Sequence, residues 1–100
     1  VVLLETPGAV MTPWRFSTAA IANLFYGGER TGPAWAAVLF GDVAPSGKLP
    51  VTFPATEASI VQPGWGGHVV YKEGLFTSYR SPESVPAFPF GHGLSFADFD

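Results

Sequence analysis

The chain has 100 residues, the size of about one small domain. Hydrophobic residues make up 47% of it and charged residues only 13%, against a usual charged share of about 25%. This composition excludes a disordered chain and predicts that part of the apolar surface faces protein. The formal net charge of −3 comes from scattered side chains, which argues against nucleic acid or a membrane as partner. The lack of cysteine excludes disulfides and thiolate metal sites.

The first part of the chain is predicted to alternate short strands with turns. Residues 1–5 form an unbroken aliphatic run, typical of a strand covered on both faces in a mainly parallel sheet. Because a buried strand at the first residue needs neighbours, we expect that the chain is truncated. Residues 9–12 are a second extended piece, ended by Pro13. Residues 16–26 are apolar, and we favour a helical turn that leads into a strand near residues 20–26, although periodicity alone does not separate helix from strand.

The clearest predicted element is a helix over residues 33–40. Thr31 offers a capping hydroxyl and Pro33 an early proline, and both signal a helix start. Apolar residues at i, i+3 and i+4 give one apolar stripe, and Gly41 stands where a left-handed C-terminal cap is expected.

The second half of the chain is predicted to hold less regular structure. Residues 42–48 are a turn cluster, and residues 49–53 form an edge strand because they contain a proline. Residues 54–67 are a long loop, of a length that is usually functional or wrapped around another body. The remaining predictions are a short strand within residues 69–79, a turn over residues 87–93 and a final strand over residues 94–99 anchored by Phe96 and Phe99.

Glycosidic hydrolysis needs two carboxyl groups, and the eight carboxylates of the chain offer no recognisable pair. Glu73 is the best single candidate because aromatic residues and a glycine flank it. Its alternative role is structural, in an ion pair with Arg80 or in a loop hydrogen bond. Trp65, in a glycine-rich loop with His68, is the plausible exposed platform for a sugar. The candidate substrate-binding residues are therefore Trp65, His68 and Glu73.

Three other chemistries find no support in the sequence. His92 lies between two glycines in a tight turn, where it is expected to bond backbone carbonyls rather than a metal. Ser46 and Ser95 lack a G-x-S-x-G context, which argues against acyl transfer. The glycine-rich residues 27–32 do not follow the dinucleotide pattern. We therefore predict no metal and no cofactor.

Three separated motifs resemble the signatures of one family. Residues 37–54, AVLFGDVAPSGKLPVTFP, resemble the LFGD-x-x-PSG-[KR]-LP-x-T-[FW]-P signature of glycoside hydrolase family 3, the β-glucosidase and β-xylosidase family. Residues 71–80, YKEGLFTSYR, are similar to its Y-x-E-G-x-x-x-G-Y-R motif, and residues 88–96, FPFGHGLSF, to its FPFGHGLSY motif. Residues 1–14 also resemble a strand and turn of the family, so the resemblance covers essentially the whole chain.

The chain departs from the family pattern in two places, so the resemblance does not predict a ligand for either of them. Residues 26–32 replace a PGQEGG-type stretch, and Ser78 replaces the usual glycine. The resemblance implies an α/β fold: a partial α/β sandwich, mainly a parallel sheet with a flanking helix, over residues 1–93. Residues 94–100 are then the first strand of a fibronectin type III-like domain.

The resemblance implies a function for the intact protein rather than for this chain. Intact members carry the aspartate nucleophile in an N-terminal barrel, and the acid/base loop precedes the strand matched by Val1, so no catalytic residue is expected here. The implied activity is retaining hydrolysis of terminal, non-reducing β-linked sugars, with a β-linked oligosaccharide or glucoside as substrate. The missing barrel and neighbouring domains are the implied partners, and the implied location is secreted or periplasmic. The alternative is a stand-alone carbohydrate-binding or accessory module without hydrolytic activity, which uses the three candidate residues above.

The family motifs are predicted to be architectural. The Pro-Ser-Gly turn sets the edge strand, and the later motifs lock the sheet to neighbouring domains. The residues given this role are Gly41, Asp42, Pro45, Ser46, Gly47, Tyr79, Arg80, Gly91, His92 and Gly93.

Overall fold

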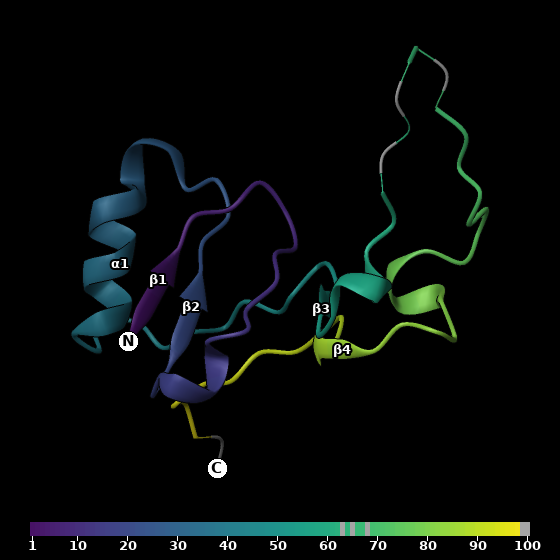
Figure 1. Cartoon of the computed structure of the whole chain (residues 1–100). Coiled ribbons are helices and arrows are strands. Elements are labelled where there is room, and N and C mark those ends of the chain that lie inside the picture. Colours follow the sequence, from purple (N-terminus) through teal and green to yellow (C-terminus); the bar gives the residue numbers. More distant parts are fainter. Residues whose placement is uncertain (63, 65, 68, 99–100) are drawn as a thin grey trace.

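The computed structural model describes residues 1–62, 64, 66–67 and 69–98. Two small sheets and one α-helix are joined by long irregular segments (Figure 1). The regular elements are the strands β1 (Val2–Leu4), β2 (Ile21–Asn23), β3 (Phe53–Pro54) and β4 (Pro86–Phe88), the helix α1 (Thr31–Leu39), and the 3₁₀ turns η1 (Arg15–Ser17), η2 (Gly28–Arg30), η3 (Glu57–Ser59) and η4 (Ser78–Arg80).

The first sheet is the parallel pair β1–β2, in which Val2 lies opposite Ile21. Hydrogen bonds from Val2 N to Ala20 O (2.9 Å) and from Leu24 N to Leu4 O (3.0 Å) extend the pairing beyond both ends of β2. The predicted strands within residues 1–5 and 20–26, and their parallel direction, are confirmed. Leu3 of β1 is 39% exposed in this chain, so the expected cover on both faces of the strand stays a prediction that depends on neighbouring protein.

The crossover between β1 and β2 contains the predicted helical turn, which is η1. The extended piece predicted over residues 9–12 pairs with no strand, and its last residue, Thr12, is buried within the crossover. The Thr12 carbonyl accepts hydrogen bonds from the backbone N–H of Arg15 (3.0 Å) and from its guanidinium (3.2 Å). The chain therefore turns here instead of extending. Asn23, the last residue of β2, is tied to the start of the crossover, because its side-chain amide donates to Thr6 Oγ1 (3.0 Å).

The predicted helix is confirmed as α1, although it begins at Thr31 rather than at residue 33. The capping role predicted for Thr31 is wrong. The 3₁₀ turn η2 continues directly into α1, and the Thr31 hydroxyl donates to Gly28 O (2.8 Å) in that turn instead of capping the helix. Gly41 follows the helix at φ +84°, which confirms the predicted left-handed C-terminal cap. Trp35 Nε1 donates to Glu5 Oε1 (3.2 Å) and so ties α1 to the end of β1. No helix in the described ranges has the length and apolarity to cross a membrane.

The second sheet is the short antiparallel pair β3–β4, with Phe53 opposite Phe88. The strand predicted over residues 49–53 is reduced to β3, because prolines at positions 50 and 54 lack the N–H that a longer ladder needs. A turn was predicted over residues 87–93, but residues 87 and 88 belong to β4. The turn therefore comprises only the later residues of that range.

The connection between β3 and β4 forms an arm, defined as residues 55–85, that stands away from the two sheets (Figure 1). Its base is closed by a hydrogen bond from Ala55 N to Val85 O (2.9 Å). The long loop predicted at its start is irregular in its described residues apart from η3. The strand predicted within residues 69–79 is wrong, since Gly74 and Ser78 have φ of +56° and +52°, which an extended strand does not allow.

The C-terminal strand predicted over residues 94–99 is also wrong for residues 94–98, which adopt no regular structure. No strand of the described part of the chain lies alongside them to supply ladder hydrogen bonds. The predicted anchor Phe96 is 58% exposed, and Phe99 lies outside the described residues.

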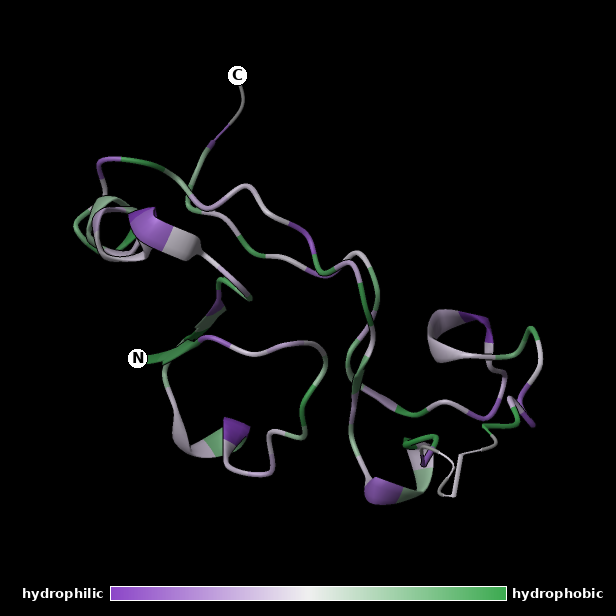
Figure 2. Ribbon diagram, turned by 90° about the horizontal axis from the view of Figure 1, so that it is seen from above, coloured by the Kyte–Doolittle hydropathy of each residue, from purple (hydrophilic) through white to green (hydrophobic). Residues whose placement is uncertain are grey.

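The chain has little core of its own. Among the described residues, Phe53 is the one buried apolar side chain, at 2% exposure. The accessible surface is 7698 Å², against about 5,500 Å² for a compact monomer of this mass, and the radius of gyration is 15.9 Å against about 13 Å. Hydrophobic segments are spread along the ribbon in Figure 2, and many of their large apolar side chains are exposed. The folded chain thus exposes much apolar surface, and the contact of this surface with other protein stays a prediction.

We expect the 100-residue polypeptide on its own to bind a hydrophobic dye and to unfold without a sharp transition, because so little apolar surface is buried. Near-UV circular dichroism during heating and ANS fluorescence measure both properties. A cooperative transition with no ANS signal would contradict this expectation.

Candidate functional site

The Pro-Ser-Gly turn and the Phe-Pro-Phe-Gly-His-Gly turn lie side by side and form what we call the motif junction, residues 45–49 and 91–93. Leu49 exchanges two backbone hydrogen bonds with the second turn: its N–H donates to His92 O (2.9 Å) and its carbonyl accepts from Gly91 N (2.8 Å). Lys48 adds a bond from Nζ to Gly93 O. Two motifs more than 40 residues apart in the sequence therefore hold each other in place.

Two glycines of the junction are required for different physical reasons. Gly91 has φ +80° with open space around it, so only the backbone conformation disfavours a side chain there. Gly93 lies against the first turn: a Cβ at this position would come within 2.5 Å of Gly47 O and 2.8 Å of the Lys48 side chain. The first glycine sets the turn, and the second permits the two backbones to approach.

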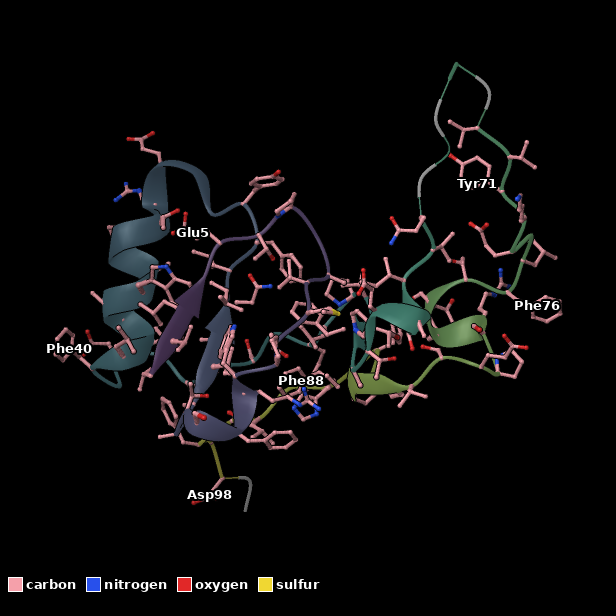
Figure 3. All side chains as sticks on the ribbon, in the orientation of Figure 1. Glu5, Phe40, Tyr71, Phe76, Phe88 and Asp98 are labelled. Atoms are coloured by element: carbon pink, nitrogen blue, oxygen red, sulfur yellow. The ribbon has the colours of Figure 1, made fainter. Side chains whose placement is uncertain are left out.

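A row of rings connects the junction to both sheets. Phe53 packs edge-on against Phe25 and against Phe88, each with a centroid separation of 6.3 Å, and Phe88 packs against the His92 ring at 5.4 Å. Phe25, just after β2, is held at the unusual φ of +55° by a hydrogen bond from its N–H to Asn23 Oδ1 (2.8 Å). Phe88 lies at the centre of the molecule in Figure 3. We call these four residues the ring row.

His92 serves the turn through its backbone, as its N–H donates to Pro89 O (3.0 Å) and its carbonyl accepts from Leu49 N. Its ring packs on the Phe88 ring. In the part of the chain that the structure describes, no group of three or more His, Cys, Asp or Glu side chains could hold a metal ion.

A mainly apolar cavity of about 520 Å³ opens between β2 and the motif junction. Its lining includes the apolar residues Ile21, Leu49, Phe88 and Phe96 and the basic residue Arg15. The described residues that line it include no carboxylate, so it lacks the two acids that glycosidic hydrolysis requires.

The predicted substrate-binding residues fall on the arm. Trp65 and His68 lie outside the described residues. Glu73 is half-buried and lines a second cavity, of about 400 Å³, which we call the arm cavity. Glu83 lines the same cavity and was missed by the sequence analysis, although it stands in a Ser-Pro-Glu-Ser turn that is rich in hydroxyls. No ion pair or side-chain hydrogen bond joins Glu73 to Arg80 within the described residues.

The other predicted architectural residues occupy two further places. Tyr79, in η4, packs on Phe90 at a centroid separation of 4.5 Å and so fastens the arm to the second turn of the junction. Arg80 is exposed at the end of η4. Gly41 and Asp42 belong to the turn that ends α1, where Val43 N bonds back to Ala37 O (3.1 Å).

Comparisons with known proteins agree on one family. The family model described as the glycosyl hydrolase family 3 C-terminal domain matches residues 1–96. The chain is 43% identical over 110 residues to a β-glucosidase of Rhizobium radiobacter and 42% identical over 107 residues to the thermostable β-glucosidase B of Acetivibrio thermocellus. These alignments cover 99% and 100% of this chain but only 13% and 14% of the relatives.

The fold is also similar to that of a solved enzyme. The crystal structure of DesR, a β-glucosidase from Streptomyces venezuelae in complex with D-glucose, aligns with a TM-score of 0.77 at 40% identity. The match covers 95% of this chain and 14% of that protein. Small sheets flanked by one helix agree with the α/β class expected from the sequence. The chain therefore belongs to glycosyl hydrolase family 3, in which it matches the C-terminal domain.

Proposed function

We propose that this chain is a structural part of a retaining β-glucosidase that hydrolyses terminal, non-reducing β-linked sugars, and that it contributes no catalytic carboxyl group. Residues 1–93 would end an α/β sandwich domain, and residues 94–100 would begin a fibronectin type III-like domain. Support comes from the family match and from the β-glucosidase names of relatives that this chain covers to about 13%. A secreted or periplasmic location is part of the proposal and depends on the family resemblance alone.

The observation that carries the proposal is the motif junction. Two family motifs are joined by backbone hydrogen bonds, which Leu49 of the first motif forms with Gly91 and His92 of the second. The cavity beside them has no carboxylate among its described lining residues. Retaining hydrolysis requires two carboxyl groups about 5 to 5.5 Å apart. The motifs are thus suited to holding backbone segments together rather than to bond cleavage.

We also propose that the barrel and neighbouring domains are the partners of this chain, and its large accessible surface supports this. The accessible surface of 7698 Å² exceeds that of a compact monomer by roughly 2,200 Å². A standard protein interface takes about 800 Å² from each partner. Contact with more than one neighbouring body would cover this excess.

We expect the 100-residue polypeptide to show no turnover of an aryl β-glucoside, while the full-length protein hydrolyses it with retention of anomeric configuration. Release of the aryl alcohol measures turnover, and NMR of the first-formed sugar gives its configuration. Hydrolysis by the short polypeptide would show that its own carboxylates are catalytic, contrary to the proposal.

Substitutions in the junction should lower stability without changing the chemistry. In the full-length protein, we expect Gly91→Val and Gly93→Ala each to reduce the free energy of unfolding by about 1–3 kcal/mol, the first through backbone strain and the second through steric overlap. The reaction rate per folded molecule should stay the same. Thermal unfolding and kcat of each variant are the measurements.

Gly47→Ala is the matched control within the junction, because a Cβ at Gly47 would meet nothing within 4 Å and its φ is not positive. It should change stability by only a few tenths of a kcal/mol. If Gly93→Ala proves as mild as Gly47→Ala, close backbone packing at the junction is not what these motifs provide.

A further inference from the structure

We propose that Ser78 and Tyr79 form a clasp that fixes the orientation of the arm on the β3–β4 pair. Ser78 Oγ accepts a hydrogen bond from Thr52 N (3.2 Å), and Thr52 directly precedes β3. The Tyr79 ring packs on the ring of Phe90, which follows β4, at a centroid separation of 4.5 Å. The clasp consists of residues of this chain alone, so it does not depend on the hydrolytic function proposed above.

The clasp holds the arm at one end of the antiparallel pair, whereas the arm begins at the other end. Since Phe53 lies opposite Phe88, residues 52 and 90 lie beyond the same end of the pair. The bond from Ala55 N to Val85 O closes the base of the arm beyond the opposite end. A segment that is attached only at its base can turn about that base, and a second attachment fixes its direction. The clasp therefore makes the arm a fixed extension of the β3–β4 pair.

The backbone of Ser78 adopts a conformation that serine disfavours. Its φ is +52°, in the left-handed region, where glycine has no steric penalty and other residues do. Ser78 also stands where the family pattern has glycine. Such conformations persist when surrounding contacts hold them, and the bond from Thr52 N is a contact of this kind. The serine thus accepts backbone strain and gains a hydrogen bond that glycine, with no side-chain oxygen, could not form.

The hydrogen bond of the clasp also lies next to the most buried ring of the chain. Thr52 is adjacent to Phe53, the buried centre of the ring row. A backbone N–H that is shielded from water needs an acceptor, and Ser78 Oγ is the acceptor that the structure gives the N–H of Thr52. Removal of the Ser78 hydroxyl would take this acceptor away. The exchange rate of the Thr52 amide hydrogen therefore measures the clasp directly.

The test compares two variants of the full-length protein by hydrogen exchange and thermal unfolding. Ser78→Ala keeps the strained backbone and removes the hydroxyl, whereas Ser78→Gly removes both. Each variant should speed exchange of the Thr52 amide by about 2- to 10-fold, the effect of losing one hydrogen bond. Ser78→Ala should also melt at a lower temperature than Ser78→Gly, because alanine is disfavoured at positive φ.

Ser81→Ala is the matched control, because Ser81 follows the same 3₁₀ turn at an ordinary φ of −80°. Its hydroxyl forms no side-chain hydrogen bond with another described residue. This variant should leave the exchange of the Thr52 amide and the melting temperature unchanged. The proposal is overturned if Ser78→Ala leaves the exchange of the Thr52 amide as slow as before, or if Ser78→Ala melts no lower than Ser78→Gly.

Discussion

The burial of one phenylalanine holds the described parts of this chain together. Phe53 packs edge-on against Phe25 and Phe88, and so joins the segment after the parallel sheet to the antiparallel pair. Burying such a side chain contributes about 1.5–3 kcal/mol, whereas ordering each residue of the backbone costs about 1–2 kcal/mol. Hydrogen bonds and partly buried contacts add to the stability that this burial gives. The ring row determines where the parallel sheet and the antiparallel pair meet, and it leaves most apolar surface exposed.

The family motifs make physical sense as packing devices around this ring row. The junction needs a turn glycine at position 91 and a glycine at position 93 that permits backbone contact with the Pro-Ser-Gly turn. The rings of Tyr79 and Phe90 form a further contact, between the arm and the Phe-Pro-Phe-Gly-His-Gly turn. The arm then projects as a separate feature with a cavity of its own.

Sequence patterns predicted the elements that depend on neighbouring residues in the chain. The helix α1, its glycine cap at Gly41 and the parallel strands were found from such signals, and the family was found from motif order. The strand expected within residues 69–79 failed because Ser78, a residue with no preference for positive φ, adopts +52°. The strand expected over residues 94–99 is absent from its described residues 94–98, because pairing requires a neighbouring strand. The contact of Gly93 with Gly47 depends on chain segments distant in sequence, which no local pattern encodes.

Hydrogen exchange of the full-length protein, compared with that of the short polypeptide, tests the central claim that this chain is completed by contact with other protein. The segments to follow are residues 21–25, 49–53 and 86–93, which carry the ring row and part of the junction. The account predicts strong protection of their amides in the full-length protein and fast exchange in the short polypeptide. Equal protection in both would mean that the ring row suffices by itself, and the claim would be wrong.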